Sequence, residues 1–215
     1  MKMYGADLSP YASRVRMQAY AKGIELEQVE PPGGLSSDAY KQLNPTGKIP
    51  ALDVEGRVIP ESEVICEYLE ERFPTPALLP ADALERSRSR TLSRSTDLYL
   101  LPALFALVPQ MDPKTRDQAE VDARLGELGQ GLDVIERHLD DSGYAVGDSL
   151  SIADCALVPA LFFITRMVPA TFGLDPLQGR AKASGWWERV QSNEHAQRVI
   201  DELTKAMQER FGGGS

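Results

Sequence analysis

The chain has 215 residues, of which 42% are hydrophobic, and its formal net charge at pH 7 is −9. This net charge argues against a general nucleic-acid binder, which normally has a basic surface, although it is compatible with a local basic patch. We therefore expect no nucleic-acid partner. The length suits one large domain or two modest ones with a sizeable buried core. Small molecules and other proteins are therefore the expected partners.

The cysteines and the apolar pattern indicate the cellular compartment of the protein. Cys66 and Cys155 lie in apolar helical patterns without metal-site spacing, so we expect buried free thiols in a reducing compartment. The first residues do not read as a leader, and no apolar stretch is expected to approach the roughly 20 residues that span a bilayer. We expect a cytoplasmic protein with no membrane partner.

The first third of the chain predicts a small mixed sheet with helices. The expected segments are a strand at 2–4, a helix at 11–22, a strand at 25–29, a short helix from Ser36 or Ser37 to 43, a hairpin at 51–54 and 57–59, and a helix that opens at 60–63 and runs to 73. The first three form a right-handed parallel βαβ unit. The order is therefore βαβαββα.

Ser9 stands directly before the first helix. Pro10 follows at an early helical position, where its missing N–H costs nothing. Serine is a common N-cap, but a hydroxyl beside the positive end of a helix also favours a negatively charged partner. The segment by itself favours the capping role and leaves an anion-directed hydroxyl as the alternative.

Helical patterns fill the rest of the chain, where we expect no further strand. Pro74, Pro76 and Pro80 mark a linker, because the residue before a proline is pushed away from helical geometry. A long helix is expected from 83 to about 108, with a kink at Pro102.

Another helix is expected to restart at Asp112-Pro113. Its apolar stripe consists of Leu125, Leu128, Leu132, Ile135 and Leu139. Gly126, Gly129 and Gly131 interrupt this helix at a cost of roughly 1 kcal/mol each relative to alanine. We therefore expect a close helix contact or a bend there.

Ser151 is the clearest helix start in the chain. Asp154 stands three residues later, where its carboxylate can complete a capping box, so we expect Asp154 to be structural. The helix that follows is almost wholly apolar, as expected at the centre of an all-helical domain. Arg166 near its end would ordinarily be a partner of the helix dipole.

Taken together, these elements resemble the cytosolic glutathione S-transferases. The resemblance rests on the βαβαββα order and on Ser9-Pro-Tyr, Asn44-Pro-Thr-Gly-Lys-Ile-Pro-Ala-Leu52, Glu61-Ser62 and Ser151-Ile-Ala-Asp154. It covers essentially the whole chain and implies an α/β thioredoxin-like N-terminal domain, an all-α C-terminal domain and a homodimer. We accordingly place the domains at 1–77 and 86–211, with a linker at 78–85 and a flexible tail at 212–215.

The resemblance also implies a glutathione site. The implied contacts are Lys48, Ile49, Pro50, Glu61 and Ser62. The Ile49–Pro50 bond would be cis and turn the Ile49 backbone outward to pair with an extended peptide. Lys48 would lie near the glycyl carboxylate, with a solvated loop lysine as the alternative. Glu61 and Ser62 would receive the ammonium and the carboxylate of the γ-glutamyl end.

In this family context Ser9 becomes the catalytic hydroxyl. A thiol with a pKa near 8.5 is mostly protonated at neutral pH, and a hydroxyl donor about 3 Å away would stabilise the thiolate. Tyr4 and Tyr11 are rivals for this role. Tyr4 fits packing within its strand better, whereas Tyr11 fits the second-substrate pocket better.

The second-substrate site is less well defined. The expected residues are Tyr11, Tyr99, Phe162 and Arg166, with the loop 31–35 nearby. Ordinary core packing is an equal alternative for each aromatic side chain.

Two segments narrow the resemblance. Asp154-Cys-Ala-Leu-Val-Pro159 followed by Arg166, and Pro76-Ala-Leu-Leu-Pro-Ala-Asp82, look like the zeta class, which includes maleylacetoacetate and maleylpyruvate isomerases. In that class an arginine at the position of Arg166 holds a substrate carboxylate. The chain departs from the class at Pro10-Tyr-Ala12 and at Thr46-Gly-Lys48.

Three functions follow from the resemblance. The first is a glutathione S-transferase that attacks a hydrophobic electrophile. The second is a glutathione-dependent cis-trans isomerase of maleylpyruvate or maleylacetoacetate, in which the thiolate adds to the double bond, the single bond rotates and the thiolate leaves. The third is a non-catalytic interaction module, against which the intact set of Ser9, Glu61 and Ser62 argues.

Overall fold

The computed structural model describes residues 1–141 and 143–211. The expected tail at 212–215 lies outside the described residues. The chain divides into two compact units, one of residues 1–79 with 193–211 and the other of residues 80–192. The boundary falls inside the expected linker, whereas residues 193–211, expected in the helical domain, cluster with the first unit.

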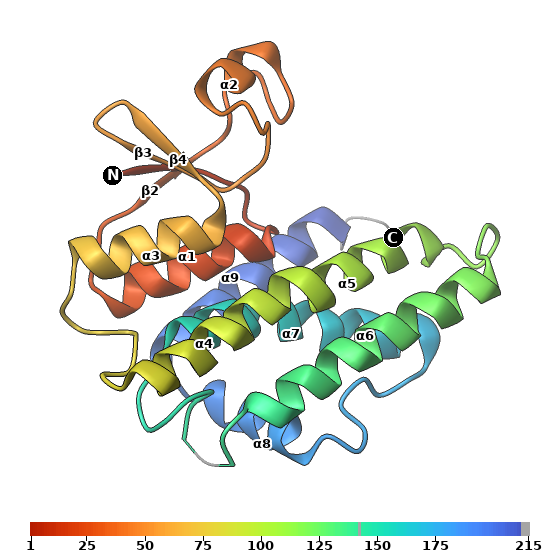
Figure 1. Ribbon diagram of the computed structural model, residues 1–215. Coiled ribbons are helices and arrows are strands. Elements are labelled where there is room, and N and C mark those ends of the chain that lie inside the picture. The colour runs from red at the N-terminus through yellow and green to blue at the C-terminus, as the bar shows by residue number, and fades with distance from the viewer. Residues whose placement is uncertain (142, 212–215) are drawn as a thin grey trace. The chain divides into compact units, whose positions relative to one another are not determined.

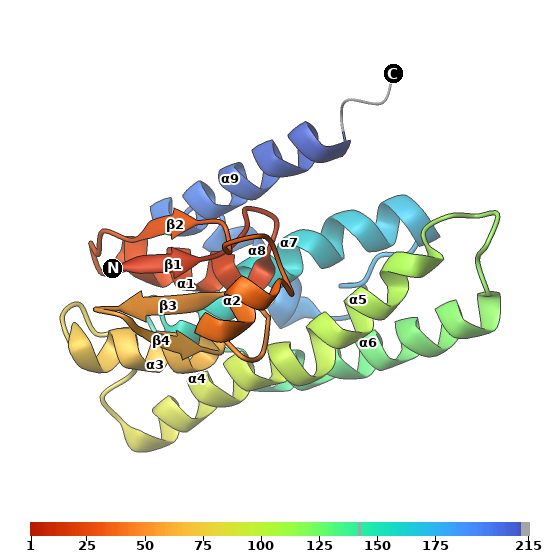
Figure 2. The same cartoon turned by 90° about the horizontal axis from the view of Figure 1, so that it is seen from above.

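The first unit contains the sheet and its helices. Its elements are β1 (Lys2–Tyr4), α1 (Pro10–Ala21), β2 (Glu27–Val29), α2 (Asp38–Leu43), β3 (Ala51–Val54), β4 (Arg57–Pro60), α3 (Ser62–Arg72) and α9 (Glu194–Phe211). The strand order is β2-β1-β3-β4, as Figure 2 shows. β1 is parallel to β2 and antiparallel to β3, and β3 is antiparallel to β4, so the predicted mixed sheet is confirmed.

Neighbouring residues of each strand face opposite layers, because side chains alternate along a strand. Met3 and Leu52 are buried with residues of α1 and α3 on one face. Tyr4 and Ala51 are buried on the other face with Tyr40 of α2. Figure 1 shows α1 and α3 side by side on one side of the sheet and α2 on the other, which is the thioredoxin-like arrangement. Packing against Tyr40 confirms the expected role of Tyr4, with ring centroids 5.5 Å apart.

The buried side chain of Lys22 holds the segment that follows α3 in the first unit. The side chain of Lys22 has no exposed surface, and its Nζ lies 2.7 Å from Glu70 Oε2. Lys22 Nζ also donates to the carbonyls of Phe73 and Pro76, both at 2.7 Å. Glu70 Oε1 in turn accepts the Leu78 N–H at 2.8 Å. The segment after α3 is therefore held on a charged centre between α1 and α3.

Among its described residues the second unit contains helices and connecting loops but no strand. Its elements are α4 (Ala83–Ser95), the π-helix η1 (Thr96–Leu100), α5 (Leu101–Leu107), the 3-10 helix η2 (Val108–Gln110), α6 (Gln118–His138), α7 (Ile152–Phe172) and α8 (Ala181–Val190). α7 packs against α4 and α8, and α5 packs against α6. This order confirms the predicted all-α region.

The expected disruption near Pro102 takes the form of the π-helix η1. Pro102 cannot donate a backbone hydrogen bond and its ring crowds the preceding turn, so a wider turn there relieves both problems. Gly131 of α6 faces this turn, since a Cβ on it would lie 2.9 Å from Leu100 Cδ2 and 3.0 Å from Tyr99 Cβ. The close helix contact predicted for the glycines is thus confirmed at Gly131, but a Cβ on Gly126 would meet nothing within 4 Å.

α6 begins later than the sequence suggested. Its N-cap is Asp117, whose Oδ1 accepts the N–H groups of Ala119 and Glu120. Asp112, at the predicted start, forms a turn in which its Oδ1 accepts the Lys114 N–H at 2.9 Å. Asp112-Pro113 therefore marks a turn, and the helix itself begins after Asp117.

α7 corrects a second expectation, because by length and composition this helix could cross a membrane. We expected no apolar stretch of that length. Within the structure, 61% of its 18-residue window is buried. Its neighbours α4 and α8 cover it, as expected for the central helix of the unit.

Candidate functional site

Ser9 is the N-cap of α1, and its hydroxyl remains able to donate. Its Oγ accepts the Ala12 N–H at 3.2 Å, which confirms the predicted cap. No hydrogen bond from the Ser9 hydroxyl to another described residue is present. The side chain is half-buried at the positive end of α1, so it can serve as cap and as donor to an anion at once.

Ile49 offers an open backbone edge. The Ile49–Pro50 bond is cis, as the resemblance implied. Neither the N–H nor the C=O of Ile49 is hydrogen-bonded to a described residue. Backbone groups left open in this way are suited to pair with an extended peptide.

Two side chains fix the peptide unit that carries the Ile49 N–H. Tyr40 Oη donates to the Lys48 carbonyl at 2.7 Å, and Asn44 Nδ2 donates to it at 2.8 Å. The C=O and N–H of a trans peptide point in opposite directions, so this hold turns the Ile49 N–H away from Tyr40 and Asn44. The exposed Lys48 side chain makes no ion pair with a described residue.

The N-terminus of α3 carries the remaining two predicted residues. Glu61 is exposed, makes no side-chain cap, and has a φ of 67°, which is uncommon outside glycine and is often kept at functional sites. Ser62 is buried, and its Oγ accepts a hydrogen bond from Arg14 Nη1 at 3.4 Å. The first turn of α3 thus joins a helix N-terminus to a buried arginine, which favours a carboxylate.

A cavity of about 490 Å³ lies beside Ile49. It is lined by the loop after β1, the end of β2 and the predicted loop: Gly5, Ala6, Asp7, Gln28, Val29, Glu30, Pro31, Gly34, Leu35 and Ile49. The structure therefore brings part of the predicted 31–35 loop next to the open Ile49 backbone.

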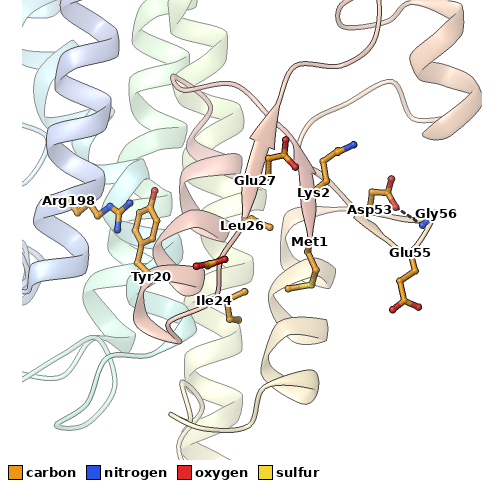
Figure 3. Close-up of a pocket in the computed structure, with 11 residues that line it drawn as sticks. Met1, Lys2, Tyr20, Ile24, Leu26, Glu27, Asp53, Glu55, Gly56 and Arg198 are labelled. Atoms are coloured by element: carbon orange, nitrogen blue, oxygen red, sulfur yellow. Dashed lines mark hydrogen bonds between the residues drawn. The ribbon is translucent and has the colours of Figure 1, made fainter.

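A second and wider cavity, of about 840 Å³, lies at the other end of the sheet (Figure 3). It is lined by the starts of β1 and β2 and by the β3–β4 turn, with Tyr20 and Arg198 at one side. None of the predicted site residues lines it. Its position, at the end of β1 away from Ser9, separates it from the candidate site.

In the helical unit the predicted residues have different surroundings. Tyr99 is 48% exposed and lines a cavity of about 290 Å³ between η1, α5 and α6. Phe162 is fully buried, and the Arg166 guanidinium lies over its ring at 3.9 Å from the centroid. Partial burial lowers the pKa of Arg166, and no carboxylate of a described residue pairs with it. Tyr11 lies half-buried in α1 of the first unit.

Several contributors were not foreseen. Arg14, Tyr40 and Asn44 support the predicted residues from inside the first unit. Asn44 belongs to the quoted motif and is a residue type that often organises turns, so its position was a usable signal. Arg14 lies on a helix face where sequence alone would favour an exposed cation.

The comparisons with known proteins identify the family of the chain. Residues 3–77 match the family described as glutathione S-transferase, N-terminal domain, and residues 96–194 match its C-terminal domain. Maleylacetoacetate isomerase of Pseudomonas aeruginosa is 36% identical over 174 residues, which are 77% of this chain and 82% of that protein. The chain belongs to the cytosolic glutathione S-transferases.

Other members of the family carry different enzyme names. Glutathione S-transferase 3 of Zea mays is 32% identical over 213 residues and 93% of each chain. A solved holo structure of maleyl pyruvate isomerase, described as a bacterial zeta-class glutathione S-transferase, has a TM-score of 0.75 and 30% identity, covering 94% of this chain and 98% of its own. Membership makes the protein an enzyme with a glutathione-dependent activity and zeta-like features.

Proposed function

We propose that this protein uses Ser9 to activate the thiol of glutathione, whose sulfur then forms a bond to a hydrophobic electrophile. The supporting observation is the hydrogen-bonding state of Ser9, which accepts the Ala12 N–H and donates to no described residue. The accepted bond and the α1 dipole polarise the hydroxyl, so that its proton can be donated to a thiolate. A thiolate stabilised in this way forms at lower pH than a free thiol.

The binding residues on this proposal are those of the first unit. The open backbone of Ile49 would pair with the peptide, and Lys48 would face a carboxylate as a point charge. Glu61 and Ser62 would receive the charged γ-glutamyl end, with Arg14 behind Ser62 strengthening the attraction for its carboxylate. Glutathione would supply the sulfur nucleophile, which bonds to carbon as a leaving group departs with its electron pair.

A second candidate function is isomerisation of a small dicarboxylate. It is favoured by Arg166, a cation stacked on Phe162 without a carboxylate partner among the described residues. The maleylacetoacetate isomerase relative adds support at 36% identity. Arg166 would hold a substrate carboxylate on this reading, and glutathione would be regenerated. We further propose a cytoplasmic homodimer, which light scattering during gel filtration would test.

Ser9→Ala tests the common first step. We expect kcat to fall about 10- to 100-fold and the thiolate absorbance of bound glutathione to titrate at higher pH, by analogy with the loss of other preorganised donors. Ser9→Thr, which keeps a hydroxyl and a cap, is the matched control. An unchanged titration in Ser9→Ala would contradict the proposal.

Two substrates separate the candidate reactions. A transferase should convert a neutral aryl halide and consume glutathione. An isomerase should isomerise maleylpyruvate while glutathione is conserved. Arg166→Ala should raise KM only for the dicarboxylate, and Arg116→Ala is the control, since Arg116 also stacks on an aromatic ring in this unit. Equal loss on both substrates would indicate structural damage and exclude carboxylate binding by Arg166.

A further inference from the structure

The loop of residues 5–8 carries Ser9 between β1 and α1. Few backbone bonds hold it: Gly5 N–H donates to Val29 at 3.0 Å, and Ser9 N–H donates to Ala6 at 3.1 Å. The position of the Ser9 hydroxyl therefore depends on side chains that hold this loop.

Arg16 of α1 holds the loop from inside the first unit. Its side chain is 8% exposed, and its Nη2 donates to the Asp7 carbonyl at 3.1 Å and to Ser13 Oγ at 2.9 Å. Its Nη1 donates to Gln28 Oε1 at 2.6 Å, and Gln28 Nε2 donates to Asp7 Oδ1 at 2.6 Å. Asp7, two residues before Ser9, is thus held at its carbonyl and at its carboxylate.

A carboxylate on α9 completes the arrangement. Glu202 Oε2 lies 3.2 Å from Arg16 Nε, across 186 positions of sequence. Its other oxygen accepts the Tyr20 hydroxyl at 2.7 Å and Arg198 Nε at 3.3 Å. Figure 3 shows Arg198 reaching from α9 towards Tyr20 of α1, and its guanidinium lies 3.6 Å from the ring centroid. Glu202 is the charge partner of a nearly buried guanidinium, which would be unstable in that geometry without it.

We propose that Glu202 is a positioning residue for the reaction: through Arg16 and Asp7 it fixes the loop that aims the Ser9 hydroxyl. The inference rests on the proposed role of Ser9. α9 thereby acts on the thiol without touching it. A displacement of the loop would weaken thiolate stabilisation more than glutathione binding, because Ile49, Lys48 and the start of α3 do not depend on this chain of contacts.

The test compares Glu202→Ala and Glu202→Gln with two controls. Glu209→Gln makes the same conservative change on α9 at a side chain that is 66% exposed. Tyr20→Phe removes one of the two hydrogen bonds at the other oxygen of the Glu202 carboxylate and keeps the contact with Arg16. Each variant is assayed well below its melting temperature for kcat, for KM, for thiolate titration of bound glutathione, and for amide hydrogen exchange of residues 5–9.

We expect Glu202→Ala to lower kcat about 3- to 10-fold, well below the hundredfold that a misplacement of about 1 Å can cause. The thiolate should titrate at higher pH, exchange in the loop should be faster, and KM for glutathione should change less than about twofold, with both controls like wild type. Glu202→Gln should lie between. Unchanged titration and unchanged loop exchange in Glu202→Ala would overturn the inference, as would a loss of stability alone. If wild type binds glutathione without forming a thiolate, the proposed function fails, and loop exchange still tests the contact.

Discussion

Trp186 Nε1 donates a 2.8 Å hydrogen bond to Asp154 Oδ1 at the centre of the helical unit. The same carboxylate accepts the N–H groups of Ala145 and Ser151 and the Ser151 hydroxyl. Burial raises the pKa of Asp154, and these hydrogen bonds oppose that shift. The predicted structural role of Asp154 is therefore confirmed. Beyond capping α7, its carboxylate joins the start of α7 to α8, through Trp186, and to the loop before α7, through Ala145.

Removing that carboxylate should strongly destabilise the protein. Asp154→Ala leaves several buried donors without an acceptor, so we expect a loss of about 3–5 kcal/mol in the free energy of unfolding. Urea denaturation followed by tryptophan fluorescence measures it. Asp141→Asn is the control, since that side chain is 84% exposed and its surface pair contributes little. A loss below about 1 kcal/mol would contradict the role given to Asp154.

Gly131 and Gly126 form a matched pair on α6. Gly131→Ala would place a methyl group 2.9 Å from Leu100 Cδ2, so we expect a net loss of about 1–2 kcal/mol after the gain in helix propensity. Gly126→Ala meets no neighbour within 4 Å and should stabilise the protein by up to about 1 kcal/mol. Thermal unfolding of both variants checks this. Equal effects of the two changes would show that the contact with η1 is not tight.

Tyr40→Phe should weaken glutathione binding without slowing the chemistry. It removes one of the two donors on the Lys48 carbonyl, and a hydrogen bond of about 0.5–1.5 kcal/mol corresponds to a KM raised about 2- to 13-fold. kcat should stay close to wild type. Tyr68→Phe removes a hydroxyl from a half-buried tyrosine of the same unit and serves as control. A fall in kcat at constant KM would contradict a role of the Lys48–Ile49 peptide unit in binding glutathione.

Alkaline pH should destabilise the first unit through Tyr20. Burial and the hydrogen bond to Glu202 raise the pKa of Tyr20 to about 12. The unfolded chain loses this proton near pH 10 while the folded protein keeps it, so the stability contributed below pH 10 is lost as the pH rises towards about 12. Tyr20→Phe should therefore lose less stability than wild type between about pH 10 and pH 12. If the free energies of unfolding of wild type and Tyr20→Phe fall in parallel with pH, Tyr20 does not cause the alkaline loss of stability.

Sequence reasoning succeeded where one residue type has a local reason for its position. Ser9 and Ser151 start helices because they can cap them, and Pro102 interrupts a helix because it lacks an N–H. The βαβαββα order and the mixed sheet were also predicted from local patterns, whereas the cis Ile49–Pro50 bond was anticipated only through the family resemblance.

The remainder depends on contacts between distant segments. Arg14 and Arg16 look like solvent-facing cations in their own helix, but Ser62 and Glu202 give them partners 48 and 186 positions away. The sequence alone carries no sign of such pairs. The start of α6 was missed for a related reason: Asp112 and Asp117 are equally good caps, and the bonds of Arg116 to Gln110, Met111 and Thr171 belong to the folded turn.

The first unit is built from two separate stretches of the chain, residues 1–79 and 193–211, and this has a consequence for its synthesis in the cell. Because domains tend to fold as they emerge from the ribosome, β1 to α3 can assemble early. Their partner α9 is translated only after the whole helical unit, residues 80–192. During that interval Arg16 lacks Glu202, so the nascent sheet domain would have the fold of the mature unit before it has the catalytic geometry. On the proposed role of Glu202, the Ser9 loop would thus reach its mature position only when α9 has been translated.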